Sequence, residues 1–364
     1  MTVHGMFASC LFAFIGTALA IACLVPMSGK LQLVDLPNQR KHHVGAIPLI
    51  GGIAVCIGVC LSVFFTFPTH SVIINVMLAC AGCMVVIGAI DDAKDISPIL
   101  RLVLQAFLTL ALCLSTDISL HQFGDVLGIG NLTIPFVDLL IAIVAVCAAI
   151  NAYNMMDGID GLAGSMAGIS LIGLSVLFGS SMQMMANICL VITVALVPYL
   201  VMNLNVPPFK RKIFMGDAGS MFLGFIIGYL VLFGSQHHEL VPAFRPVTAL
   251  WLIGLPLMDM VGVMIRRIHK GQSPLRPDRN HLHHILLHAG FTPRESLLLI
   301  VVANLGIVFF GIVAEQAKVP EWLMMVLYLL LFAAYSLCLA HAWRLGRWVK
   351  GLKAPASDSA RIKS

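Results

Sequence analysis

Long apolar runs separated by short polar segments recur along this chain as far as about residue 342. Each run approaches the roughly 20 residues that an α-helix needs to cross the apolar core of a bilayer. The pattern therefore predicts an all-α, polytopic membrane protein with a bundle of about eleven transmembrane helices. We place the spans at 7–28, 46–66, 71–90, 99–116, 133–150, 162–180, 184–202, 219–235, 246–265, 296–314 and 322–342.

The positive charges indicate how these spans are oriented. With the N-terminus outside, the inner segments are 29–45, 91–98, 151–161, 203–218, 266–295 and the tail from 343. Of the 22 Lys and Arg residues, only Arg245 and Lys318 then fall on the outer side. This is the distribution that the positive-inside tendency favours. We expect one transmembrane catalytic domain at 1–342 and a basic cytoplasmic tail at 343–364, which either lies on anionic lipid or acts only as a topology signal.

Composition excludes a soluble domain with a single anchor. Apolar residues make up 59% of the chain and charged residues 11%, and the mean hydropathy is +0.97. Soluble proteins average roughly 45–50% apolar residues. The ten cysteines lie mostly within apolar runs, where they are expected to be buried thiols. Membrane lipid is an expected partner and nucleic acid is not.

Carboxylates gather where apolar runs meet the inner segments. They are Asp91, Asp92, Asp157, Asp160 and Asp217. Charges at the edge of a bilayer are costly, so they are candidates for function. The adjacent Asp91 and Asp92 repel each other, which is typical of a site that holds a cation or transfers a proton, and ordinary solvated charge is the alternative. Arg101, about one turn into the next span, is placed to reach this pair or a phosphate.

Asn154, Asp157 and Asp160 recur every three residues after an apolar span. On a continuous helix they would form one polar stripe, and Gly158 and Gly161 would let a ligand approach the backbone. Amide and carboxylate oxygens at this spacing suit Mg²⁺, which takes one or two protein ligands plus waters and substrate phosphate. A capped helix end is the alternative interpretation.

Further along the chain, Gly216 and Gly219 bracket Asp217 at the start of a span. A helix that begins there would favour anions at its N-terminus and would present the carboxylate to a metal ion. Phe214 either stacks on a nucleobase or packs in the protein. In the first inner segment, Arg40 and Lys41 form either a phosphate cradle or an ordinary positive loop.

The largest inner segment combines arginines with three histidines. They are Arg266, Arg279, His281, His283 and His284. The spacing differs from the i, i+4 pair of a zinc helix, so hydrogen bonding to phosphate or sugar is favoured over a metal site.

Two placements around this segment can be predicted. His281 and His284 are expected to share one helix face. Asp259, inside the preceding span, is expected to pair with Arg266 or to cap a polar cavity.

Four segments together resemble the polyprenyl-phosphate N-acetylhexosamine-1-phosphate transferases. They are 88–92, 151–161, 214–219 and 281–284, in this order and on the same predicted side of the membrane. The runs 246–251 and 277–284 resemble the branch that uses N-acetylglucosamine and undecaprenyl phosphate. The resemblance implies a bundle of ten or eleven helices with a cytoplasmic groove, dependence on Mg²⁺ or Mn²⁺, and a place in the bacterial inner membrane.

The resemblance also implies roles for individual residues. Asn154 and Asp217 match the metal-ligand positions, and Phe214 matches the position that stacks on uracil. Arg101 matches a basic residue at the donor pyrophosphate. The acids Asp91, Asp92, Asp157 and Asp160 are expected to be catalytic, and Asp160 also to bind uridine. Sugar and phosphate recognition is expected of His281, His283, His284, Arg266 and Arg279, and acceptor-phosphate binding of Arg40 and Lys41.

The implied reaction transfers N-acetylglucosamine 1-phosphate from UDP-N-acetylglucosamine (UDP-GlcNAc) to undecaprenyl phosphate and releases UMP. Its lipid product would start a cell-surface polysaccharide of the O-antigen or enterobacterial common antigen type. The same chemistry with another UDP-N-acetylhexosamine stays open, as does a homodimer. A secondary transporter is disfavoured, because transporters place acids near the bilayer midplane and show internal repeats.

Overall fold

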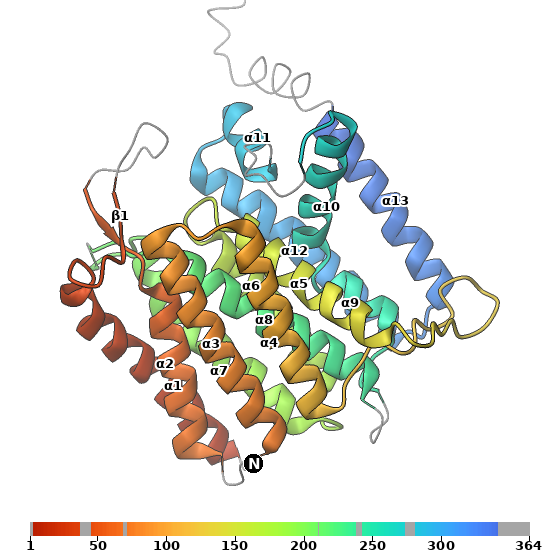
Figure 1. Cartoon of the computed structure of the whole chain (residues 1–364), viewed down its shortest axis with the longest axis horizontal. Coiled ribbons are helices and arrows are strands. Elements are labelled where there is room, and N and C mark those ends of the chain that lie inside the picture. The colour runs from red at the N-terminus through yellow and green to blue at the C-terminus, as the bar shows by residue number, and fades with distance from the viewer. Residues whose placement is uncertain are drawn as a thin grey trace, which may run out of the picture.

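A computed structural model of the chain describes residues 3–36, 45–67, 71–209, 211–237, 242–273 and 281–340. In this part of the chain the structure is almost wholly helical, as the apolar pattern predicts, with one two-stranded sheet (Figure 1). The predictions for Arg40, Lys41, Arg279 and the tail from 343 lie outside the described residues.

Within the described ranges, eight helices are long and apolar enough to cross a bilayer. They are α1 (Val3–Leu24), α3 (Val72–Lys94), α4 (Pro98–Thr116), α5 (Asp138–Met156), α7 (Gln183–Asn203), α8 (Gly216–Gln236), α12 (Pro293–Gln316) and α13 (Glu321–Ala340). The apolar helices α2 (Gly51–Thr66) and α6 (Leu162–Phe178) are shorter. The chain is therefore an integral membrane protein. The count of about eleven spans and the orientation of the termini stay predictions, although every predicted span has a helical counterpart.

The predicted span at 246–265 is broken into α9 (Pro246–Leu252) and α10 (Gly254–His269), which meet at 82°. Pro256 causes the break, because it has no N–H to donate to the Leu252 carbonyl. Instead Ser170 Oγ donates to that carbonyl at 2.7 Å, and the Tyr153 hydroxyl donates to Ser170 Oγ at 2.6 Å. A carbonyl freed inside an apolar bundle needs such a partner. The prediction of one continuous helix is wrong at this point.

Helix α8 runs through the centre of the bundle and is buried along its length except at Asp217. Helices α2, α3 and α5 pack against it. A Cβ on Gly52 would lie 2.0 Å from Gly219 Cα, and one on Gly88 would lie 2.4 Å from Ala218 Cα. Small residues allow helix backbones to approach this closely. As a result, the C-terminal end of α3 lies beside the first turn of α8.

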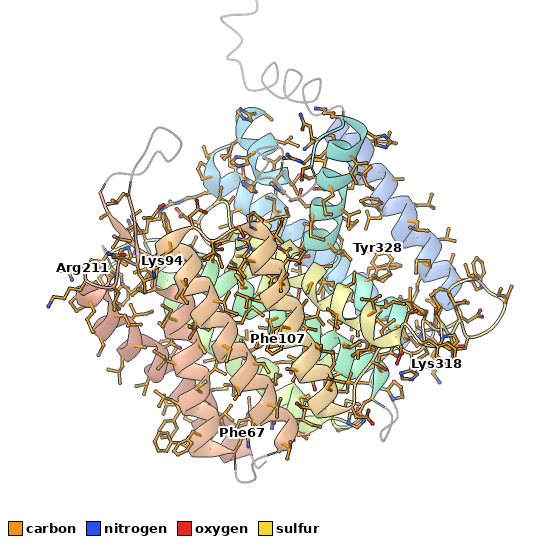
Figure 2. All side chains as sticks on the ribbon, in the orientation of Figure 1. Phe67, Lys94, Phe107, Arg211, Lys318 and Tyr328 are labelled. Carbon is orange, nitrogen blue, oxygen red and sulfur yellow. The ribbon has the colours of Figure 1, made fainter. Side chains whose placement is uncertain are left out.

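The short sheet lies at the same end of the bundle. Strand β1 (Val34–Asp35) pairs antiparallel with β2 (Ile47–Pro48). The chain after β2 is tied to the segment before α8, since Phe214 N donates to Pro48 O at 2.8 Å and Gly51 N donates to Phe214 O at 2.9 Å. Helix α11 (Leu282–His288) also lies at this end (Figure 1). Figure 2 shows Lys94 and Arg211 on one side of the molecule and Lys318 on the opposite side.

Replacing Gly52 by Ala is expected to destabilise the bundle, because the new Cβ meets backbone atoms of α8 that cannot move aside. Overpacking of this kind costs about 1–3 kcal/mol, and we expect a lower melting temperature in detergent. Gly82→Ala in α3 is the matched control, because nothing lies within 4 Å of its Cβ position. Equal melting temperatures for the two variants would contradict the close α2–α8 contact.

Candidate active site

A polar cavity of about 850 Å³ opens at the end of the bundle where α3, α5 and α8 meet. Seven predicted site residues line it: Asp91, Asp92, Asn154, Asp157, Asp160, Phe214 and Asp217. They come from segments far apart in the sequence, as the family resemblance requires. Strand β1 also contributes Val34 and Asp35 to the wall of the cavity. Leu287 of α11 and Pro293 of α12 line it as well.

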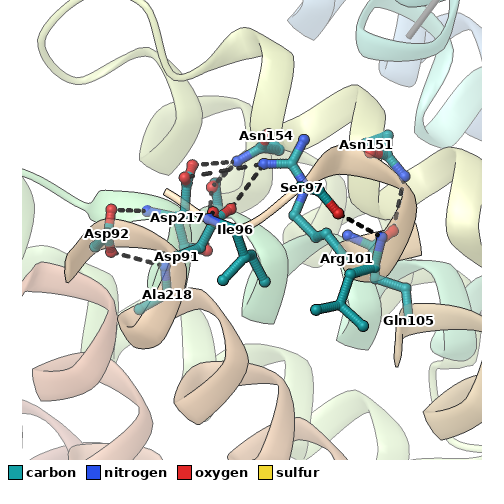
Figure 3. A network of polar contacts seen from close by, with 12 residues as sticks. Asp91, Asp92, Ile96, Ser97, Arg101, Gln105, Asn151, Asn154, Asp217 and Ala218 are labelled. Carbon is teal, nitrogen blue, oxygen red and sulfur yellow. Dashed lines mark hydrogen bonds and ion pairs between the residues drawn. The ribbon is translucent and has the colours of Figure 1, made fainter. Parts of the chain in front are cut away.

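Asp92 caps the N-terminus of α8. Its Oδ1 accepts a hydrogen bond from Asp217 N at 2.9 Å, and its Oδ2 accepts one from Ala218 N at 3.1 Å (Figure 3). A carboxylate at this point satisfies free N–H groups and interacts favourably with the helix dipole. Gly216 is required there, since its φ is +73° and a Cβ would lie 2.5 Å from Asp92 Oδ2. Asp92 therefore fixes the position from which Asp217 projects.

Asp91 forms an ion pair with Arg101. The guanidinium Nη1 lies 2.9 Å from Asp91 Oδ2 and 3.9 Å from Asp217 Oδ2 (Figure 3). Asp91 Oδ1 also accepts from Ile96 N at 2.9 Å, which fixes the turn between α3 and α4. The prediction that Arg101 reaches back to the acidic pair is confirmed. One cation thus lies between two carboxylates and reduces their mutual repulsion.

Asn154 and Asp217 are in direct contact. Asn154 Nδ2 donates to Asp217 Oδ1 at 2.6 Å and to Ser220 Oγ at 2.9 Å. The opposite orientation of the amide would present its oxygen beside the carboxylate. Ser220 was not predicted from the sequence, although it lies one helical turn after Gly216.

Asp157 and Asp160 do not continue the helical stripe that their spacing predicts. Helix α5 ends at Met156, and 157–161 form a turn in which Gly161 has φ +76°. Both acids nevertheless line the cavity. Asp157 is partly exposed to the cavity but surrounded by protein, and this burial raises its pKa to about 8, with further contributions from the charges of neighbouring acids.

Two residues that sequence reasoning did not assign hold this turn. Asn203 Oδ1 accepts from Gly161 N at 2.5 Å, while its Nδ2 donates to Ile213 O at 2.8 Å. Lys212 Nζ lies 2.6 Å from Asp160 Oδ2 and 5.1 Å from the centroid of the Phe214 ring. The only sequence signal was the position of Lys212 in a basic run next to Phe214.

The histidine segment lies behind the turn. A Cβ on Gly158 would lie 2.0 Å from His283 Nε2, and His283 is only 1% exposed. The prediction that His281 and His284 share a helix face is wrong, because His281 is the extended residue before α11. Its ring instead lies parallel to that of His283, with 6.0 Å between centroids.

Asp259 in α10 accepts from His281 Nδ1 at 2.7 Å, so the expected pairing with Arg266 is replaced by a pairing with the histidine segment. None of the three histidines is among the residues that line the cavity. Among the described residues, no group of three or more His, Cys, Asp or Glu side chains is arranged to hold a metal ion.

The burial of His283 generates a prediction about pH. Burial, and then the neighbouring His284, lower its pKa to about 3. An unfolded histidine has a pKa of about 6.5, so the wild type should lose stability as the pH falls from about 6.5 towards 3, because only the unfolded chain takes up the proton. Relative to His283→Gln, the loss at pH 5 should be about 2 kcal/mol. Melting curves of both proteins at pH 8 and pH 5 measure it, and a constant difference between them would contradict the assignment.

Comparison with known proteins agrees with this geometry. The model of glycosyl transferase family 4 matches residues 73–235. The chain is 40% identical to the undecaprenyl-phosphate α-N-acetylglucosaminyl 1-phosphate transferase of Escherichia coli O157:H7, with 93% of this chain and 92% of the relative covered. It is 41% identical to the enzyme of that name from Pasteurella multocida, over 96% and 97% of the two chains. Identity at this level across almost the whole length shows that the chain belongs to the same family as these transferases.

Proposed function

We propose that this protein transfers N-acetylglucosamine 1-phosphate from UDP-GlcNAc to undecaprenyl phosphate at the cytoplasmic face of a bacterial inner membrane, with release of UMP. The observation that carries the proposal is the convergence of acids, an amide, a guanidinium and an aromatic ring on one cavity at one end of a membrane bundle. The names of the relatives specify undecaprenyl phosphate and the N-acetylglucosaminyl 1-phosphate group, which supports the transfer.

The residues around Asp217 fit Mg²⁺, with Mn²⁺ as a substitute. The side-chain amide of Asn154 lies 2.6 Å from Asp217 Oδ1, and the two residues would supply one or two oxygen ligands. That number suits an ion completed by water and substrate phosphate, and it does not suit a structural zinc site. Asp92 fixes Asp217 by accepting from its backbone N–H, and the Arg101 guanidinium lies 3.9 Å from its carboxylate. When bound, the ion would neutralise charge that develops on the departing UMP.

The donor would lie between the sheet of β1 and β2 and the 157–161 turn. Phe214 offers an aromatic surface for uracil, and Asp160 offers a carboxylate that accepts hydrogen bonds from the base or ribose. Arg101 would contact the pyrophosphate by exchanging part of its pairing with Asp91 for phosphate oxygens. Lys212, held at 2.6 Å by Asp160, brings a second cation to the same subsite.

The acceptor phosphate would approach the same carboxylates, with Arg40 and Lys41 as further cations. Because a phosphate monoester is largely dianionic near neutral pH, Asp91 or Asp92 has little proton removal to do, and electrostatics carry most of the catalysis. We prefer a direct displacement at phosphorus over a covalent aspartyl intermediate. Incubation with UDP-GlcNAc alone tests this choice, since a phosphosugar trapped on the protein would contradict it.

An apolar cavity of about 270 Å³ is suited to part of the polyprenyl chain. It is lined from α5, α8, α9 and α10, and Ala149 in its wall is five residues before Asn154 on the same helix. At 1.5 Å per residue, the nearest residue of the cavity wall on α5 is about 7–8 Å from Asn154 along the helix, and the wall extends from there back to Ile141. An acceptor with an apolar tail and a phosphate head would meet both environments from one helix.

The decisive assay uses purified protein, undecaprenyl phosphate and a panel of UDP-sugars, with and without chelator. We expect label from UDP-GlcNAc in the extractable lipid, no transfer after chelation, and no sugar flux into liposomes. Preference for another UDP-N-acetylhexosamine would keep the chemistry and change the donor. Flux without transfer would indicate a transporter.

Asp217→Asn should abolish turnover at every Mg²⁺ concentration while the protein stays folded. Loss of several kcal/mol of charge stabilisation corresponds to a fall in kcat of at least about 10³-fold. Asp117→Asn is the matched control, because Asp117 follows α4 at the end of that helix away from the site. Wild-type rates in Asp217→Asn would remove Asp217 from the metal site.

His281→Ala should damage use of the donor more than use of the acceptor. The His281 ring lies parallel to that of His283, which packs behind the turn that carries Asp157 and Asp160, so its loss should weaken the donor contacts of that turn. One weakened hydrogen bond to the donor is worth about tenfold in kcat/KM for UDP-GlcNAc, with the KM for undecaprenyl phosphate nearly unchanged. Steady-state kinetics with each substrate varied in turn measure this split. Equal changes for both substrates would argue against a role in sugar recognition.

A further inference from the structure

We propose that Asp259 and Tyr335 are positioning residues that orient His281 and, through it, the 157–161 turn that lines the donor side of the cavity. The inference rests on the proposed function and deepens it, because it names residues outside the cavity on which donor specificity depends. We call Asp259, His281 and Tyr335 the Asp259 cluster.

The first argument is the geometry of the buried carboxylate. Asp259 is 0% exposed and His281 is 4% exposed. Asp259 Oδ2 accepts from His281 Nδ1 at 2.7 Å, and Oδ1 accepts from the Tyr335 hydroxyl at 2.5 Å and from Leu282 N at 3.0 Å. Three donors from two separate elements therefore converge on one side chain. The carboxylate fixes the backbone where α11 begins and the direction of the imidazole.

The second argument is the free-energy cost of burying a carboxylate. A carboxylate taken out of water loses several kcal/mol of hydration, and replacing such a polar cluster by packed apolar residues is often neutral or stabilising. A bundle whose cluster served only stability would gain nothing from an acid at this point. Ionisable groups within membrane helices are therefore functional candidates, with their partners named. Here the partner is His281, whose ring lies parallel to that of the histidine packed behind the cavity turn.

The third argument is the path from the cluster to the site. The break at Pro256 turns α10 away from α9 and brings Asp259 beside the start of α11. The ring of His281 lies parallel to that of His283 at 6.0 Å, and His283 packs behind Gly158 in the turn that lines the cavity. A displacement of His281 would thus be transmitted to the turn that carries Asp157 and Asp160.

The chemical consequence is a fixed tautomer. A neutral histidine whose Nδ1–H donates to a carboxylate presents Nε2 as an acceptor. The carboxylate thereby fixes the ring that lies parallel to His283 behind the 157–161 turn. Outer-shell carboxylates hold metal-bound histidines by the same arrangement, and their removal typically costs 10–100-fold in affinity or activity. Asp259 touches no reacting atom, so its effect must pass through His281.

The test is a double-mutant cycle in the full-length protein. Asp259→Asn should lower kcat/KM for UDP-GlcNAc by about 10–100-fold, with little change in the KM for undecaprenyl phosphate. In a His281→Ala background the same substitution should add less than about twofold, because its target is gone. Full additivity of the two effects, or equal damage to both substrates, would overturn the proposal.

Milder variants keep the test valid if Asp259→Asn does not fold. Tyr335→Phe removes one hydrogen bond, which is worth about three- to tenfold, and should show the same donor-selective pattern. Tyr328→Phe, in the same helix but packed against Trp251, is the matched control and should behave as wild type. Identical behaviour of the two variants would contradict the role of Tyr335.

A readout without turnover separates this inference from the proposed function. In ¹⁵N-histidine-labelled protein, the resonances lost in His281→Ala identify His281, and we expect the Nδ1–H tautomer in the wild type and its loss in Asp259→Asn. A tautomer that persists in Asp259→Asn overturns the positioning role. If the Nδ1–H tautomer is lost in Asp259→Asn but the wild type turns over no UDP-sugar, the positioning role stands and the proposed function fails.

Discussion

The first turn of α8 is the structural element on which the site depends. Its free N–H groups are capped by a carboxylate from another helix, Asp92 in α3, and this contact exists only because Gly88 lets α3 approach the backbone of α8. Inside a bilayer, irregular backbone and unpaired polar groups are excluded, so polar chemistry must gather where helices end. The cap places the end of α3 against the beginning of α8 and directs Asp217 towards Asn154. A change that separates these two helices would therefore remove the site before it changed any catalytic group.

Charge balance is the second constraint. Seven aspartates line one cavity, and Asp157 has a raised pKa because of burial and the charges of neighbouring acids. Arg101 lies between Asp91 and Asp217, and Lys212 pairs with Asp160. In the proposed function each of these cations would also contact a phosphorylated substrate. The protein thus holds its acids together with cationic side chains, and in the proposed reaction these cations would exchange partners with the pyrophosphate, which would link the stability of the site to its electrostatic role.

The broken span supplies the third element. Pro256 frees the Leu252 carbonyl, Ser170 satisfies it, and the resulting bend carries α10 to the histidine segment. Without the bend, Asp259 would face the bundle at another height and could not accept the hydrogen bonds of His281 and Leu282. Through this bend, Pro256 links the membrane helices to the histidine segment at the start of α11. The link is made by the buried hydrogen bonds of Asp259.

The sequence by itself determined the class of protein, its helical runs and seven of the polar and aromatic residues that line the cavity, because apolar length and isolated carboxylates are local properties of the chain. Arg101 could be expected near Asp91 since one turn and a short loop separate them. Other features required the tertiary structure. Asp157 and Asp160 lie in a turn after α5, and Asn203 of α7 holds Gly161 at the end of this turn. Asp259 pairs with His281 because the bend before α10 brings it beside the start of α11. Spacing along one helix says nothing about such partners, since contacts between distant segments depend on how the helices pack.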